Sequence, residues 1–205
     1  MQAFIKNEIQ KTSALMSKIE EDAPLLNTVE HIAQRCIAAL RQGGKILFAG
    51  NGGSAADSQH LAAELVGRLS YDRPGIAAIA LTTDTSALTA VGNDYSFEQI
   101  FSRQVEAIAR KGDVLIGIST SGKSRNILNA LKTARDKGML TVGFTGAAAP
   151  LMVECCDFVL QVPSRETPKI QESHIMLGHI ICGLIEEAMY GAEYNPKRHA
   201  ETAGA

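Results

Sequence analysis

Short apolar runs alternate with longer amphipathic segments along most of the chain. The runs cover residues 45–50, 76–82, 113–119, 140–146 and 158–162. Each is almost continuously apolar, as expected for a strand that is covered on both faces in a parallel sheet. Apolar residues at helical spacing follow at 54–69, in two stretches up to about residue 110, and at 126–137 and 168–189. This alternation predicts an α/β fold with a five-stranded parallel sheet flanked by helices.

The first 42 residues show two helical segments and no strand. Apolar residues fall at helical spacing in both segments: Ile5, Ile9 and Leu15, then Val29, Ile32, Cys36 and Leu40. The sequence Asp22-Ala23-Pro24 separates them, because proline ends one helix and can begin the next. We therefore expect a single domain with a helical extension at 1–42, a core at 43–190 and a polar tail at 191–205.

Composition and charge exclude several classes of partner. The 205 residues carry a formal net charge of -2, with 45% apolar and 20% charged residues, as in ordinary globular proteins. A chain with this charge offers no large basic surface for nucleic acid or an anionic membrane. Tryptophan is absent and aromatic residues are only 5%, so stacking on single-stranded bases is not expected either.

The predicted compartment is the cytoplasm. The first residues lack the apolar core of a signal peptide, and no uninterrupted apolar stretch reaches the roughly 18 residues of a membrane span. The four cysteines show no spacing typical of a metal site. We interpret them as small apolar residues in a reducing compartment: Cys36, Cys155, Cys156 and Cys182.

Polar and glycine-rich clusters follow the predicted strands, which is where ligands bind in parallel sheets. The first cluster is Gly50-Asn51-Gly52-Gly53-Ser54, at the start of a predicted helix. Its backbone N–H groups suit an anion or a sugar hydroxyl. A tight turn that merely needs glycine would have the same sequence.

His60 and Glu64 lie four residues apart on the helix that follows. This spacing puts both side chains on one face, where they could share a metal ion or a substrate proton. An isolated pair of this kind is more often solvated or packed in a core. Alanines at 55, 56, 62 and 63 make this helix slim enough to approach a sheet or a second subunit closely, which favours a functional role.

The third cluster, Ser119-Thr120-Ser121-Gly122-Lys123-Ser124, lies between a strand and a helix. Its hydroxyls and helix-terminal N–H groups suit a phosphate monoester. From Gly117 the same string also fits the nucleotide-binding P-loop pattern. A P-loop enzyme needs an acidic residue after a second strand to hold magnesium, and the strands offer only Asp84, upstream. We therefore favour the phosphate monoester over a nucleotide.

The closing helix carries a fourth cluster. Gln171 and His179 lie two turns apart with an angular offset of about 80°, so they flank one surface. Glu172 and His174 point elsewhere on the helix, and we expect them at the surface or at an interface. Taken alone, His179 would more often be a packing histidine than a proton donor.

Together these motifs resemble the phosphoheptose isomerases of the SIS (sugar isomerase) domain family. The resemblance rests on G-N-G-G-S-A-A-D-x-Q-H-x-A-A-E at 50–64, N-D-Y at 93–95, S-T-S-G-x-S at 119–124 and I-Q-E-x-H at 170–174, and it runs from about Gly43 to Met189. The first motif is the most specific. The resemblance implies a flavodoxin-like SIS fold, a homotetramer and a phosphorylated sugar as substrate. The implied reaction converts sedoheptulose 7-phosphate to D-glycero-D-manno-heptose 7-phosphate, the first step towards activated heptose.

The resemblance also implies roles for matching positions. Glu64 and His179 match the acid–base pair of the family. A zinc ion is implied at His60, Glu64, Gln171 and His179. Substrate contacts are implied at Asn51, Gly52, Gly53, Glu64, Asn93, Asp94, Ser119, Thr120, Ser121, Ser124 and Gln171. Lys123 and Pro168 depart from the family pattern, and neither is assigned a role.

Ketose-to-aldose conversion moves a proton between adjacent carbons through an enediol. Glu64 could carry that proton between C1 and C2 while His179 serves ring opening and the oxygen proton. Zinc could instead polarise the carbonyl. Sites in this fold often combine subunits, so Glu64 and His179 could meet across an interface. The alternative function is a non-catalytic SIS protein that binds the bacterial replication initiator, but relatives of that kind lack the acid–base pair.

Overall fold

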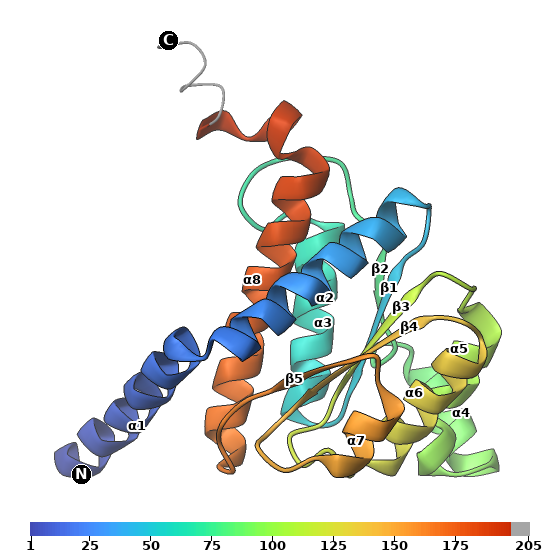
Figure 1. Ribbon diagram of the computed structural model, residues 1–205. Coiled ribbons are helices and arrows are strands. Elements are labelled where there is room, and N and C mark those ends of the chain that lie inside the picture. The colour runs from blue at the N-terminus through green and yellow to red at the C-terminus, as the bar shows by residue number, and fades with distance from the viewer. Residues whose placement is uncertain (198–205) are drawn as a thin grey trace.

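A computed structural model of the chain, which describes residues 1–197, contains one sheet of five parallel strands (Figure 1). The strand order is β2-β1-β3-β4-β5, so the order reverses between β1 and β3 as in flavodoxin-like folds. The strands are β1 Ile46–Gly50, β2 Ala78–Ala80, β3 Val114–Ile118, β4 Leu140–Thr145 and β5 Phe158–Gln161. The predicted fold class is confirmed, although β2 is shorter than the apolar run at 76–82.

Helices cover both faces of the sheet. Their bounds are α1 Gln2–Glu21, α2 Ala23–Arg41, α3 Gly53–Val66, α4 Thr85–Asp94, α5 Ser102–Ile108, α6 Arg125–Asp136, α7 Pro150–Cys155 and α8 Thr167–Tyr194, with a 3₁₀ turn at Phe97–Gln99. Alternate strand residues point to opposite faces. Ile46 and Phe48 pack with α2, α3 and α8, whereas Leu47 and Ala49 pack with α5, α6 and α7.

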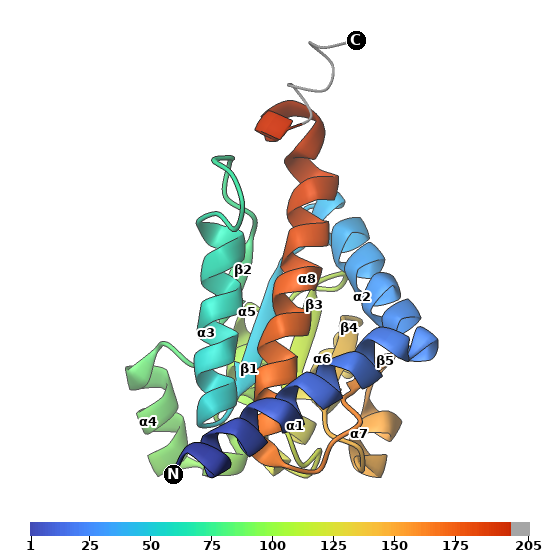
Figure 2. The ribbon, with the colours of Figure 1, turned by 90° about the vertical axis from the view of Figure 1, so that its left-hand side faces the viewer.

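The two amino-terminal helices are confirmed, and the break between them has a local cause. The Asp22 carboxylate accepts a hydrogen bond from the Leu25 backbone N–H at 3.0 Å and so caps α2, with Pro24 in its first turn. Beyond the buried Leu15 and Ile19, α1 projects from the body of the protein and crosses the start of α8 (Figures 1 and 2). Phe4, Ile5 and Ile9 on its free part are exposed.

Three expectations about the chain need correction. A short helix, α7, fills the connection between β4 and β5, where none was predicted. Helix α8 continues to Tyr194, so residues 191–194 are helical and not part of a polar tail; residues 198–205 of that tail lie outside the described residues. Cys36 and Cys182 are buried, as interpreted, but Cys155 and Cys156 are only half-buried; all four are free thiols.

Helix α8 is long and apolar enough, by length and composition, to cross a membrane. Core helices of globular proteins pass the same test. Here α8 lies beside α2 and α3 and buries residues such as Leu177, Ile181 and Ile185 in the core (Figure 2). The helix alone therefore does not indicate a membrane protein.

Candidate functional site

The site begins with the close approach of α3 and α8, which lie side by side (Figure 2). Gly178 of α8 faces Leu61 of α3, and a Cβ at this glycine would lie 2.7 Å from a Leu61 methyl carbon. Because each of these residues is followed or preceded by a histidine, the same contact brings His179 to His60. The approach depends on a residue without a side chain at position 178.

His60, Glu64 and His179 form one cluster. The Nε2 atoms of His60 and His179 are 2.9 Å apart, and His60 Nε2 lies 3.2 Å from a Glu64 carboxylate oxygen. The potential ligand atoms of the three residues all lie within 4.8 Å of one another. The His60 side chain is 52% exposed and that of Glu64 20%, so the cluster opens to solvent. Glu64 and His179 therefore meet within one chain.

This donor set fits a zinc ion. Two imidazole nitrogens and one carboxylate oxygen are the ligands of many catalytic zinc sites, which leave a position open for water or substrate. The exposed side of His60 would provide that opening. The expected fourth ligand, Gln171, lies two turns, about 12 Å along the axis, before His179 on α8.

Gln171 instead lies against the glycine-rich turn at the start of α3. A Cβ at Gly53 would lie 2.4 Å from Gln171 Nε2, so the glycine lets the Gln171 amide approach this turn closely. Gly52, with φ of +56°, adopts a backbone conformation that favours glycine. The turn thus presents its backbone and the Gln171 amide together at the carboxyl end of β1.

A reciprocal amide pair joins this turn to the first turn of α6. Asn51 and Asn126 exchange two side-chain hydrogen bonds, at 2.9 and 2.8 Å. Asn126 is buried in the first turn of α6, and its carboxamide oxygen also accepts from the Ile127 backbone N–H at 3.0 Å. The sequence analysis missed Asn126, because asparagine near a helix start is also a common cap.

The serine-rich loop is held in one conformation by its own hydroxyls and by β4. Ser119 Oγ and Ser124 Oγ are 2.9 Å apart, and the Thr120 carbonyl accepts from the Gly146 backbone N–H at 3.1 Å. Gly122 has φ of +63°, and a Cβ there would lie 2.2 Å from Ala149 Cβ. This loop therefore cannot accept a side chain at 122.

A cleft of about 210 Å³ lies beside this loop. Thr120, Ser121 and Lys123 line one side, and Ser164 and Arg165 line the other. Two cationic side chains and several hydroxyls give the cleft the chemistry expected for a phosphate. Lys123 thus lies at this cleft, although sequence alone assigned it no role.

The remaining predicted contacts, Asn93 and Asp94, are exposed at the end of α4. The Asn93 amide donates to the Asp94 carboxylate at 2.8 Å. The acid that a P-loop enzyme would need is already used, because Asp84 caps α4 by accepting from the Ala87 backbone N–H at 2.9 Å. This geometry argues against the nucleotide alternative.

His174 departs from the sequence analysis, and Asp57 was not singled out there. We expected His174 at the surface or at an interface, yet it is 1% exposed and its Nε2 lies 3.2 Å from the Thr145 carbonyl oxygen. Glu172 is half-buried and accepts from the Thr12 hydroxyl at 2.7 Å. Asp57, one turn before His60, has a buried carboxylate oxygen without a partner, and burial raises the pKa of its carboxyl.

Two glycines of α8 provide a test of the close approach. Gly178→Ala is expected to lower the free energy of unfolding by about 1 kcal/mol, because overpacking against Leu61 outweighs the gain in helix propensity. Gly183→Ala is the matched control: its Cβ would meet Leu69 at an ordinary 3.6 Å, so we expect a stabilisation of about 0.5 kcal/mol. Urea unfolding measures both, and equal effects would contradict the assignment of Gly178 as the contact point.

Comparison with known proteins gives consistent results. The SIS domain model matches residues 9–146. A phosphoheptose isomerase of Burkholderia pseudomallei is 57% identical over 190 residues, which cover 93% of this chain and 96% of that protein. A phosphoheptose isomerase of Aneurinibacillus thermoaerophilus is 53% identical, with the same coverage. The solved structure of the Neisseria gonorrhoeae phosphoheptose isomerase superposes with a TM-score of 0.85 at 42% identity, covering 91% of this chain and 98% of that one.

Proposed function

We propose a substrate and a mechanism from the premise that this chain belongs to the SIS domain family and, within it, to the phosphoheptose isomerases. It is therefore an isomerase that acts on a sugar phosphate. The proposed reaction converts sedoheptulose 7-phosphate to D-glycero-D-manno-heptose 7-phosphate. The observation that supports it is the cluster of His60, Glu64 and His179 on the helices that begin at the substrate-binding edge of the sheet. Non-catalytic binding of the replication initiator is not favoured.

The phosphate end of the substrate is proposed to lie on the loop after β3. Ser119, Thr120, Ser121 and Ser124 offer hydroxyls there, and α6 offers backbone N–H groups at its amino end. The turn formed by Asn51, Gly52 and Gly53, with Gln171 and the pair Asn93 and Asp94, would contact sugar hydroxyls. The proposed substrate contacts therefore come from segments spread along the chain, from the turn after β1 to helix α8.

Proton transfer is proposed to fall to Glu64 and His179. Glu64 takes the proton from C1 and returns it to C2, and a half-buried carboxylate that is reachable from solvent suits this task. His179 serves ring opening and moves the proton on oxygen. A zinc ion held by His60, Glu64 and His179 would supply Lewis-acid polarisation of the substrate carbonyl when bound.

A homotetramer is proposed from the resemblance to the phosphoheptose isomerases, and exposed apolar side chains on two helices support association. Phe4, Ile5 and Ile9 of α1 and Ile180 and Leu184 of α8 are all exposed in the single chain. Apolar surface of this extent is usually covered by another subunit. We place the enzyme in the cytoplasm, at the first step of activated heptose synthesis.

The test is turnover of sedoheptulose 7-phosphate by the purified protein, after chelation and again after addition of Zn²⁺. We expect heptose 7-phosphate to form, with Zn²⁺ restoring activity that chelation removes. Product formation without any response to Zn²⁺ would remove the metal from the mechanism. A folded protein that forms no product under either condition would contradict the proposed function.

A further inference from the structure

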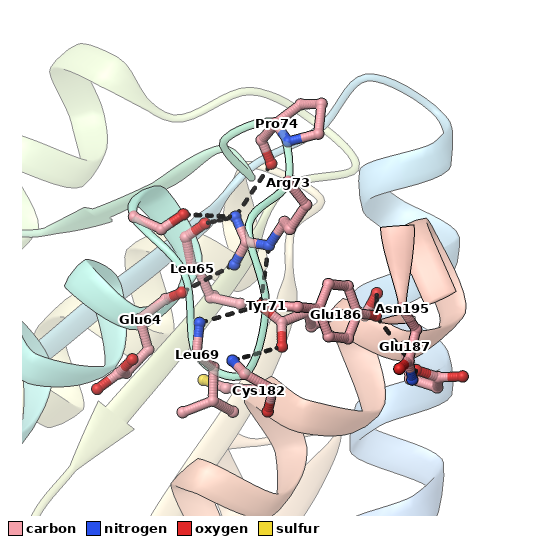
Figure 3. Close-up of polar contacts among 12 residues, drawn as sticks. Glu64, Leu65, Leu69, Tyr71, Arg73, Pro74, Cys182, Glu186, Glu187 and Asn195 are labelled. Carbon is pink, nitrogen blue, oxygen red and sulfur yellow. Dashed lines mark hydrogen bonds and ion pairs between the residues drawn. The ribbon is translucent and has the colours of Figure 1, made fainter. Parts of the chain in front are cut away.

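Behind the cluster, a buried ion pair joins α8 to the loop between α3 and β2 (Figure 3). Arg73 of the loop and Glu186 of α8 meet at 3.0 Å, Nε to Oε1, and their side chains are 0% and 1% exposed. Burying two charges costs several kcal/mol of desolvation each, and the pair alone does not always recover it. The hydrogen bonds of the two side chains to the backbone therefore decide whether the ion pair stabilises this part of the structure.

The guanidinium of Arg73 caps the carboxyl end of α3. Its Nη2 donates to the Glu64 carbonyl at 2.8 Å, and its Nη1 donates to the Leu65 and Gly67 carbonyls at 2.7 and 3.0 Å. The last carbonyls of a helix have no partner within it, and a positive charge there is favourable. Arg73 thus fixes the turn of α3 that carries Glu64.

Glu186 holds the loop and the arginine against α8. One carboxylate oxygen accepts from Arg73 Nε and from the Leu69 backbone N–H, and the other accepts from the Ser70 backbone N–H at 2.9 Å. Both oxygens are thus bonded, and the guanidinium reaches backbone carbonyls on its other side (Figure 3). A network satisfied in this way is rigid.

The ion pair of Arg73 and Glu186 links α3 and α8 at a second place, away from the contact of His60 with His179. Glu186 lies seven residues, or two turns, after His179 on the same face of α8. Helix α8 is therefore linked to the end of α3 twice: His179 lies against His60, and Glu186 holds Arg73, which donates to the Glu64 backbone carbonyl. The Glu64 side chain lies beside His60, which contacts α8 through His179, and the Glu64 backbone is tied to α8 through Arg73.

We propose that Arg73 and Glu186 are positioning residues that set the geometry of Glu64 relative to His179. This inference rests on the proposed function, in which these two residues transfer protons. Both side chains of the ion pair are buried, so they act through Glu64 and do not touch substrate. A displacement of about 1 Å at a reacting group can cost roughly 100-fold in rate, so loosening the end of α3 should affect kcat far more than KM.

Two variants test the proposal. Arg73→Lys keeps the charge beside Glu186, but an ammonium cannot reach the carbonyls of Glu64, Leu65 and Gly67 together. The double variant Arg73→Met/Glu186→Met removes both charges, so it leaves no unpaired ion that could unfold the protein. In each we expect kcat to fall about 10- to 100-fold, with KM within about threefold of the parent.

The matched control is Asp113→Asn, directly before the central strand β3. Asp113 is also buried, pairs with Lys45 and accepts from the Lys45 and Arg110 backbone N–H groups. The Asp113→Asn variant should be less stable than the parent but should keep the parent kcat. A kcat within threefold of the parent in the double variant, or an equal fall in Asp113→Asn, would overturn the proposal.

Zn²⁺ titration separates this proposal from the proposed function. If the parent does not turn over the heptose phosphate, the affinity of His60, Glu64 and His179 for Zn²⁺ still reports their geometry. We expect that affinity to fall about tenfold in Arg73→Lys and in the double variant, as when residues that orient metal ligands are changed in other proteins. Unchanged Zn²⁺ affinity would then overturn the role of the ion pair.

Discussion

Replacing Glu64 with glutamine is expected to abolish turnover of the heptose phosphate, with a loss of about 10³- to 10⁴-fold in kcat. Glutamine has nearly the same shape as glutamate but cannot accept a proton. The Glu64 carboxylate lies 3.2 Å from His60 Nε2, and its ligand oxygen lies within 4.8 Å of the His179 ring nitrogen. No second carboxylate belongs to the cluster among the described residues, so nothing there could replace it.

Substrate binding shows whether this loss is one of proton transfer. Calorimetric titration of Glu64→Gln with substrate should give an affinity close to that of the parent, because the proposed phosphate contacts lie on the loop after β3. The matched control is Glu106→Gln, which removes an exposed carboxylate that pairs with Arg103 on α5 and should leave kcat unchanged. Residual activity of Glu64→Gln within tenfold of the parent would remove Glu64 from the role of base.

The sheet and its order of elements could be predicted because buried parallel strands leave a strong local pattern. The runs ending at Gly50, Ile118 and Thr145 are almost entirely apolar, and in the structure each lies between two helical layers. Helix α7 was missed because Pro150–Cys155 is too short to show helical periodicity. It is held by tertiary packing of Met152 on the sheet, which no local pattern reveals.

The site also has parts that the sequence could predict and parts that it could not. The spacing of His60 and Glu64 was enough to place them on one face of a helix. The meeting of His179 with His60 depends on the fit of Gly178 against Leu61, a contact between residues 117 positions apart that periodicity cannot reveal, so only the resemblance supplied it. Arg73 and Glu186 were not singled out at all, because charged residues in a loop and on a helix usually face solvent.

The burial of His174 was also not predictable from its local sequence. This burial predicts how the free energy of unfolding depends on pH. This α8 residue is 1% exposed, its ring packs beside that of Phe144, and its Nδ1 is buried without a partner. Desolvation lowers the pKa of His174 to about 4, although its contact with the Thr145 carbonyl opposes the shift. The folded protein thus holds a neutral imidazole that the unfolded chain protonates near pH 6.5.

Stability should therefore fall as the pH falls from about 6.5 to about 4, because the unfolded state binds a proton that the native state does not. The difference of about 2.5 pKa units corresponds to roughly 3 kcal/mol over that range. His174→Gln keeps a donor for the Thr145 carbonyl but does not titrate, so it should lose this part of the pH dependence while being less stable at pH 7. Urea unfolding of parent and variant between pH 4 and 7 measures the difference. If the free energies of unfolding of parent and variant change in parallel with pH, His174 is protonated or reaches solvent in the folded protein. If the two values converge towards pH 4, the buried neutral imidazole limits the stability of the parent in acid.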